Sequence, residues 1–191
     1  KSILKMTCMR MFLILTCLFV GVGYWSAPAA SGEKRIPVAT SDEGKVPVGK
    51  LKPGDASPEF MAVDSNRRLV SLKDFKGKYV YVDLWATWCS PCVGQIPHLQ
   101  RLEKLFKGKK IVFVSISCDE DVDEWLGYLR KNKMEGVQLN FDCNRRFQDA
   151  YGVKAIPRFI LLDKKGRVVN PNMTRPSDPE TEKTLNALKG I

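Results

Sequence analysis

The sequence predicts an α/β domain in which a central sheet with mixed strand directions is flanked by helices. Three observations lead to this fold class. Segments with strand propensity alternate with segments of helical periodicity through the middle of the chain. The run Tyr79–Trp85 is almost continuously apolar, as in a strand buried on both faces. Hairpin-like pairs of short strands occur near the start of the domain and near its end.

The first thirty residues differ from the rest of the chain. Lys1, Lys5 and Arg10 are basic, residues 11–25 form an apolar run, and residues 27–29 have the small-residue pattern Ala-x-Ala. A basic start, an apolar run and such a site are typical of an export signal, cleaved here before Ala30. The alternative is an uncleaved membrane anchor, although the run is shorter than the ~18–20 residues that a spanning helix needs.

The predicted domain organisation follows from this leader. Residues 1–29 are a signal peptide or N-terminal membrane anchor, residues 30–50 are a polar linker, and residues 51–191 form the folded domain. We therefore expect an exported protein, in the periplasm or associated with the cell envelope, with a possible membrane tether at its N-terminus.

The charge of the chain argues against nucleic acid as a partner. Loss of residues 1–29 leaves 28 basic and 21 acidic side chains, a net charge of +7. The basic residues form no cluster with interleaved aromatic side chains, which is the usual sign of a nucleic-acid surface. A basic, solvated surface is the better interpretation.

The elements of the domain are predicted in order along the chain. Segments 60–63 and 68–72 form a β-hairpin around the turn at 64–66. One helix begins near Cys89 and ends at Gly108, with Pro91 tolerated in its first turn. The remaining predicted elements are strands at 79–85, 111–116, 137–141, 158–163 and 167–169, and helices at 121–132, 145–151 and 178–188.

The pair Cys89 and Cys92 lies at the start of this first helix, directly after the buried strand. A Cys-x-x-Cys pair in this position is typical of a redox site. A disulfide that closes so small a ring adds little loop-closure entropy, so a structural cross-link is the weaker interpretation. The helix N-terminus stabilises a thiolate, and this effect is strongest at Cys89, the first of the two cysteines. We therefore assign Cys89 as the attacking nucleophile and Cys92 as the resolving thiol.

Other chemistries for this pair fit less well. Zinc needs four ligands, and the sole histidine, His98, lies on the opposite face of the predicted helix. A peroxidase would need Pro and Thr before its cysteine, where this chain has Ala86 and Val82. Two alternatives remain open: a non-catalytic binding module, and a protein that holds Cu(I) between the two thiolates. We predict no bound metal and no cofactor.

Two motifs resemble those of the thioredoxin superfamily. Residues 82–92, Val-Asp-Leu-Trp-Ala-Thr-Trp-Cys-Ser-Pro-Cys, are similar to the active-site run of thioredoxins, and residues 151–157 are similar to their second signature. The N-terminal hairpin and a helical insertion between Ser117 and Phe147 resemble the exported TlpA/ResA-type thiol-disulfide oxidoreductases. The resemblance covers residue 51 to the C-terminus and implies a thioredoxin-like fold.

This resemblance also implies roles for residues beside the two cysteines. Asp83 matches a buried acid that accepts the proton of Cys92. Trp88 matches an aromatic residue that shields the disulfide, whereas Trp85 is expected in the core. Pro157 matches a cis-proline facing the disulfide, which leaves the main chain of Ile156 to pair with a substrate; the alternative is an ordinary trans proline.

The resemblance also implies partners. We expect protein disulfides as substrates, apocytochrome c being one candidate client, and a membrane or periplasmic thiol as the upstream electron donor. Reduction of clients is the expected direction, although the potential of the couple decides between a reductant and an oxidant.

Three residues have no settled role at this point. Members of the exported group often carry an extra acidic residue near the site, and Glu120 is a candidate by its loop position alone. Cys118 and Cys143 each follow a predicted strand, so they could pair in a second disulfide, or each could be a free buried thiol.

Overall fold

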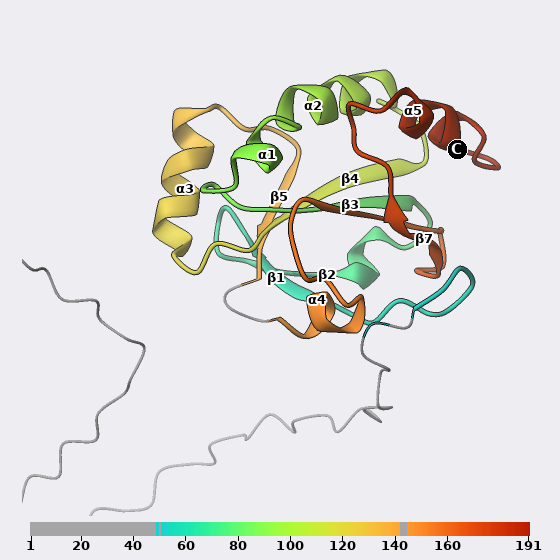
Figure 1. Ribbon diagram of the computed structural model, residues 1–191, viewed down its shortest axis with the longest axis horizontal. Coiled ribbons are helices and arrows are strands. Elements are labelled where there is room, and N and C mark those ends of the chain that lie inside the picture. The colour runs from blue at the N-terminus through green and yellow to red at the C-terminus, as the bar shows by residue number, and fades with distance from the viewer. Residues whose placement is uncertain (1–48, 50, 142–144) are drawn as a thin grey trace, which may run out of the picture. The chain divides into compact units, whose positions relative to one another are not determined.

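The computed structural model describes residue 49 and residues 51–141 and 145–191 (Figure 1). The predicted signal or anchor at 1–29 lies outside the described residues, as does the predicted linker at 30–50 apart from Gly49. Within the described part of the chain, no helix is long and apolar enough to cross a membrane.

Seven strands form one mixed sheet. Their order across the sheet is β2 (Leu69–Ser71), β1 (Met61–Asp64), β5 (Val137–Asn140), β4 (Ile111–Ser117), β3 (Tyr79–Trp85), β6 (Arg158–Leu162) and β7 (Val168–Met173). The central strands β3, β4 and β5 run parallel, and the strands outside them pair antiparallel. The predicted α/β class and its antiparallel edges are confirmed.

Helices cover both faces of this sheet (Figure 1). They are the 3₁₀ helix η1 (Leu72–Phe75), α1 (Ser90–Val93), α2 (Ile96–Leu105), α3 (Val122–Lys131), α4 (Arg146–Ala150) and α5 (Pro179–Asn186). Successive strand residues face opposite sides of a sheet. Tyr81 of β3 therefore packs in a cluster with Leu102 of α2 and Leu185 of α5, whereas Val82 packs in a cluster with Phe147 of α4.

The predicted single helix from Cys89 to Gly108 is wrong, because the structure contains two helices there. Helix α1 ends at Val93 and α2 begins at Ile96. Pro97 explains the break: proline has no N–H to donate, and its ring clashes with the carbonyl four residues earlier, which belongs to Val93. The break separates the short helix that carries the cysteines from the longer helix that covers the sheet.

The insertion predicted between Ser117 and Phe147 contains helix α3 and also strand β5. This strand pairs parallel with β4 and antiparallel with β1. The N-terminal hairpin is thereby joined to the sheet through the insertion. A surface ion pair of 2.6 Å between Arg67 and Asp123 adds a second link between the hairpin and α3.

Candidate active site

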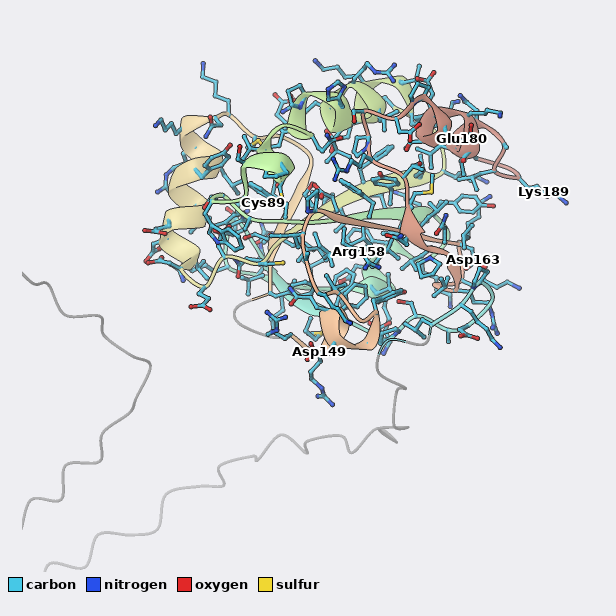
Figure 2. The ribbon with its side chains drawn as sticks, in the orientation of Figure 1. Cys89, Asp149, Arg158, Asp163, Glu180 and Lys189 are labelled. Atoms are coloured by element: carbon cyan, nitrogen blue, oxygen red, sulfur yellow. A yellow bond between two sulfur atoms is a disulfide. The ribbon has the colours of Figure 1, made fainter. Side chains whose placement is uncertain are left out.

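The two cysteines form a disulfide at the beginning of α1. Their Cα atoms are 5.2 Å apart, and both residues are buried. Cys89 is the N-cap of α1, and its sulfur accepts a hydrogen bond of 3.3 Å from the backbone N–H of Cys92. Figure 2 shows Cys89 at the start of this helix. An N–H that points at the sulfur, together with the positive end of the helix, stabilises a thiolate once the disulfide opens.

Asp83 is a buried carboxyl group on the same sheet face as this disulfide. It lies two residues before Trp85 on β3, and Trp85 packs in one cluster with both cysteines. Asp83 is 6% exposed, and the Ser115 hydroxyl donates a hydrogen bond of 3.4 Å to it. Burial raises the pKa of Asp83 to about 7, and the nearby charge of Glu103 adds to this rise. The carboxyl group can therefore exchange a proton near neutral pH.

An open pocket of about 1050 Å³ lies beside the disulfide. Trp88, Cys89 and Pro91 line one side of it, and the segment 153–156 lines another. Trp88 is 70% exposed, so it stands at the mouth of the pocket and not in the core. The structure brings Trp88, Cys89 and Ile156 together around one open space.

The Ile156–Pro157 peptide bond is cis, as the resemblance to thioredoxins implies. Ile156 lines the pocket, whereas Pro157 is not among its lining residues. Trp85 is fully buried, in agreement with its expected place in the core.

The acidic and basic side chains that line the pocket come from different segments of the chain. Glu120, Asp121 and Glu124 lie on the side of the β4–α3 loop and α3, while Arg145 and Lys154 belong to later segments. Glu120 is exposed at this rim. At this position Glu120 can contact a bound client, but its side chain is not buried near the two sulfur atoms.

Cys118 also lines the pocket, and its thiol is free. The Gln148 side-chain amide donates a hydrogen bond of 2.9 Å to its sulfur. Burial raises the pKa of this thiol to about 12, and the neighbouring charge of Asp119 adds to the rise. A thiol that stays protonated at neutral pH is a poor nucleophile, so Cys118 is not suited to attack. Cys143 lies outside the described residues.

The described residues contain no cluster of three or more His, Cys, Asp or Glu side chains that could hold a metal ion. His98 is exposed on α2. It belongs to the helix beyond the break, not to the helix that begins at the cysteines.

Sequence reasoning missed Asp119 at this site. Its buried carboxylate binds Thr87 in the loop directly before Cys89. One signal could have found it: an acidic residue two positions after a buried strand, at the sheet end where the active-site loop begins.

Comparisons with known proteins agree with this arrangement. A family profile described as Redoxin matches residues 52–188. The ResA thiol-disulfide oxidoreductase of Bacillus thuringiensis (strain Al Hakam) is 32% identical over 124 residues, which are 63% of this chain and 69% of that protein.

Solved structures show the same fold. A solution structure of a candidate thiol-disulfide oxidoreductase from Bacteroides vulgatus is 48% identical, with a TM-score of 0.64, and the match covers 69% of this chain and 86% of that one. A crystal structure of a candidate thiol-disulfide oxidoreductase from the same species is 38% identical, with a TM-score of 0.69, and covers 72% and 96% of the two chains.

Proposed function

This chain belongs to the Redoxin family and is a thioredoxin-like thiol-disulfide oxidoreductase of the TlpA/ResA type, and from that premise we propose that it is exported and reduces disulfides in client proteins. One observation carries the proposed reaction: the Cys89–Cys92 disulfide sits at a helix N-terminus, and Cys89 lines an open pocket. A reactive disulfide needs both a stabilised thiolate and access for a partner.

The reaction transfers two electrons from the dithiol to the client. The Cys89 thiolate attacks one sulfur of the client disulfide, which forms a mixed disulfide and expels the other client sulfur as a thiolate. Cys92 then loses its proton and attacks the Cys89 sulfur. This second step releases the remaining client sulfur and leaves the Cys89–Cys92 disulfide that the structure contains.

Asp83 is proposed as the base of the second step. With its pKa near 7, the carboxylate form is available at neutral pH and can take the proton of Cys92, directly or through water. The protonated form then returns the proton to solvent or to a product thiolate. Burial therefore brings the pKa of Asp83 close to neutral pH, where this proton transfer takes place.

Trp88, Ile156 and Pro157 are proposed to receive the client. The exposed ring of Trp88 provides apolar surface beside Cys89, and Ile156 supplies the facing wall of the pocket. A client segment held between them presents its disulfide to Cys89. The shared pocket supports this assignment for Trp88 and Ile156, and for Pro157 the support is the resemblance of the second motif to thioredoxins.

The place of action is proposed from the leader at residues 1–29. Export of the domain to the periplasm or cell envelope places it where client disulfides persist. Each turnover leaves it oxidised, so a membrane or periplasmic dithiol must reduce it again. Protein disulfides in general are the proposed substrates, and apocytochrome c is the narrower candidate.

The experiment is a trapping assay with paired variants. Cys92→Ser cannot resolve the mixed disulfide, so it should accumulate covalent complexes with clients that dithiothreitol releases. The double variant Cys89→Ser, Cys92→Ser should trap nothing. Cys118→Ser in the Cys92→Ser background is the matched control and should trap as much as Cys92→Ser alone, since the Cys118 thiol is buried and protonated. Complexes that persist without Cys89 would overturn the assignment of the nucleophile.

The direction of electron flow needs a second measurement. The reduction potential of the Cys89–Cys92 couple, measured against glutathione, should be more negative than that of the glutathione pool. A value well above it would identify an oxidant and contradict the proposed reduction of clients. Absence of insulin reduction in the presence of dithiothreitol would instead favour a binding module.

A further inference from the structure

Asp119 accepts hydrogen bonds from three donors at the base of the active-site loop. It is 4% exposed and follows β4 by two residues. The backbone N–H of Thr87 lies 3.2 and 3.1 Å from its two carboxylate oxygens, and the Thr87 hydroxyl donates to it at 2.8 Å. The hydroxyl of Ser117 donates to the second oxygen at 2.5 Å.

The sheet in turn holds Asp119. Its backbone N–H donates to the Ser117 hydroxyl at 2.9 Å. The side-chain amide of Asn140, at the end of β5, donates to the Asp119 carbonyl at 3.0 Å and to the Ser117 hydroxyl at 3.2 Å. Ser117 and Asn140 are fully buried. The carboxylate is thus fixed on the ends of two parallel strands.

Thr87 links this anchor to the reactive sulfur. The loop between β3 and the N-cap Cys89 contains only Ala86, Thr87 and Trp88. The Cys89 N–H donates to the Ala86 carbonyl at 3.1 Å, and Thr87 lies between these two residues. We therefore expect a movement of Thr87 to shift the Cys89 sulfur relative to the Cys92 N–H, from which this sulfur accepts a hydrogen bond.

We propose that Asp119 is a positioning residue for the nucleophile: it holds Thr87 to the sheet and so keeps the Cys89 sulfur at the N-terminus of α1. Once the disulfide opens, Cys89 loses its covalent link to Cys92, and the hydrogen bonds from Thr87 to Asp119 remain. A carboxylate suits this task because both of its oxygens accept hydrogen bonds. An asparagine side chain has only one oxygen that can accept them. This inference rests on the proposed role of Cys89 as the attacking thiol.

The sign of a pKa change distinguishes positioning from simple electrostatics. Asp119 lines the same pocket as Cys89, together with the charged groups Glu120, Asp121, Glu124, Arg145 and Lys154. Removal of a negative charge from this pocket by itself favours a thiolate and lowers the pKa of Cys89. Loss of positioning weakens the hydrogen bond from the Cys92 N–H and raises that pKa. The two effects are opposite in direction.

The test measures the rate at which iodoacetamide alkylates Cys89 as a function of pH. It uses the reduced, full-length chain in a Cys92→Ser background, so that the tryptic peptide 79–101 contains Cys89 alone. Asp119→Ala should raise the apparent pKa of Cys89 by at least about half a unit, which slows alkylation about threefold at pH values below the parent pKa. Thr87→Val, which removes only the hydroxyl donor, should shift the pKa in the same direction by less.

Asp121→Asn is the matched control. It removes a charge from the same rim and keeps an acceptor at the N-cap of α3, so it should not raise the pKa of Cys89. An unchanged or lower pKa in Asp119→Ala would overturn the inference. If that variant does not fold, a Thr87→Val profile that superimposes on the parent overturns it. An ordinary thiol pKa of about 8.5 for Cys89 in the parent would instead contradict the proposed function.

Discussion

The ionisation of Asp83 couples stability to pH at the level of a single residue. A carboxyl group in the unfolded chain titrates near 3.9, whereas burial raises the pKa of Asp83 in the folded chain to about 7. The folded state therefore binds this proton more tightly. The stability that Asp83 contributes is complete below about pH 4, falls as the pH rises to about 7, and is lost above that.

We expect Asp83→Asn to stabilise the protein at alkaline pH. The amide carries no charge to bury, so the free energy of unfolding should exceed that of the parent by a few kcal/mol at pH 8, at about 1.4 kcal/mol per unit of pKa shift. At pH 4 the two proteins should be nearly equal. Urea denaturation across this range checks the prediction, with the exposed Asp149→Asn as control. A difference that does not change with pH would show that Asp83 is not the titrating group.

Trp88 is expected to affect client binding with little effect on stability. The residue is 70% exposed, so Trp88→Ala removes few internal contacts. A large aromatic side chain at an interface often contributes strongly to affinity. We predict a rise in KM for a protein disulfide of about tenfold, equivalent to roughly 1.4 kcal/mol, and a change in unfolding free energy within about 0.5 kcal/mol.

The control for Trp88 is Leu69→Ala on β2. Leu69 is 69% exposed, which matches Trp88, but it does not line the pocket. Its substitution should leave KM unchanged. An equal rise in KM for both variants would contradict a specific role for Trp88.

Among the elements, the cap of α3 gives a direct prediction. The Asp121 side chain accepts hydrogen bonds from the backbone N–H groups of Asp123 at 2.8 Å and Glu124 at 3.0 Å. Asp121→Ala leaves both donors without this acceptor and should lower the unfolding free energy by about 1 kcal/mol. Asp121→Asn keeps the cap and should cost much less. Urea denaturation measures both, and an equal loss would show that the cap contributes nothing.

Local signals explain which elements could be predicted from sequence. Strand β3 was predicted with its observed bounds, because seven β-prone residues lie between a turn and the cysteine motif. The start of α3 was predicted at Asp121, a residue type that favours N-caps. The break between α1 and α2 was missed because the apolar spacing continues through it. Pro97 indicates a helix boundary at this point, but the regular apolar spacing favoured one continuous helix.

Long-range pairing explains what could not be predicted. The position of β5 between β4 and β1 depends on hydrogen bonds to strands distant in sequence, and no local pattern encodes them. The same is true of Asp119, whose partner Thr87 lies 32 residues earlier. Cys89, Cys92 and Asp83 could be proposed from sequence because they lie in one continuous motif, whereas the contact of Asp119 with Thr87 forms only once the sheet has formed.

At the scale of the whole molecule, the chain from residue 42 onward should fold alone. The described residues all belong to one compact unit, and their hydrophobic clusters begin only at Leu51. Removal of residues 1–41 should therefore change the thermal midpoint by less than about 2 °C, the effect of half a kcal/mol or so in a domain of this size. Calorimetry and insulin reduction measure the outcome.

A second truncation tests how far the domain extends. The Gly49 N–H donates a hydrogen bond of 3.0 Å to the Ala150 carbonyl at the end of α4. A chain that begins at Leu51 lacks this bond and should lose about 1 kcal/mol, which lowers the thermal midpoint by about 2–4 °C. Equal midpoints for the two truncated chains would place the boundary after Gly49.

Gly152→Ala supplies the internal check on this boundary, because Gly152 has a positive φ of 59° and a Cβ there would lie 2.8 Å from the Cα of Gly49. The substitution meets two costs in the chain from residue 42: the left-handed backbone and the clash with Gly49. Only the backbone cost remains in the chain from residue 51. The loss of stability should therefore be smaller in the shorter chain, and the difference between the two losses measures the cost of the clash between the added Cβ and Gly49.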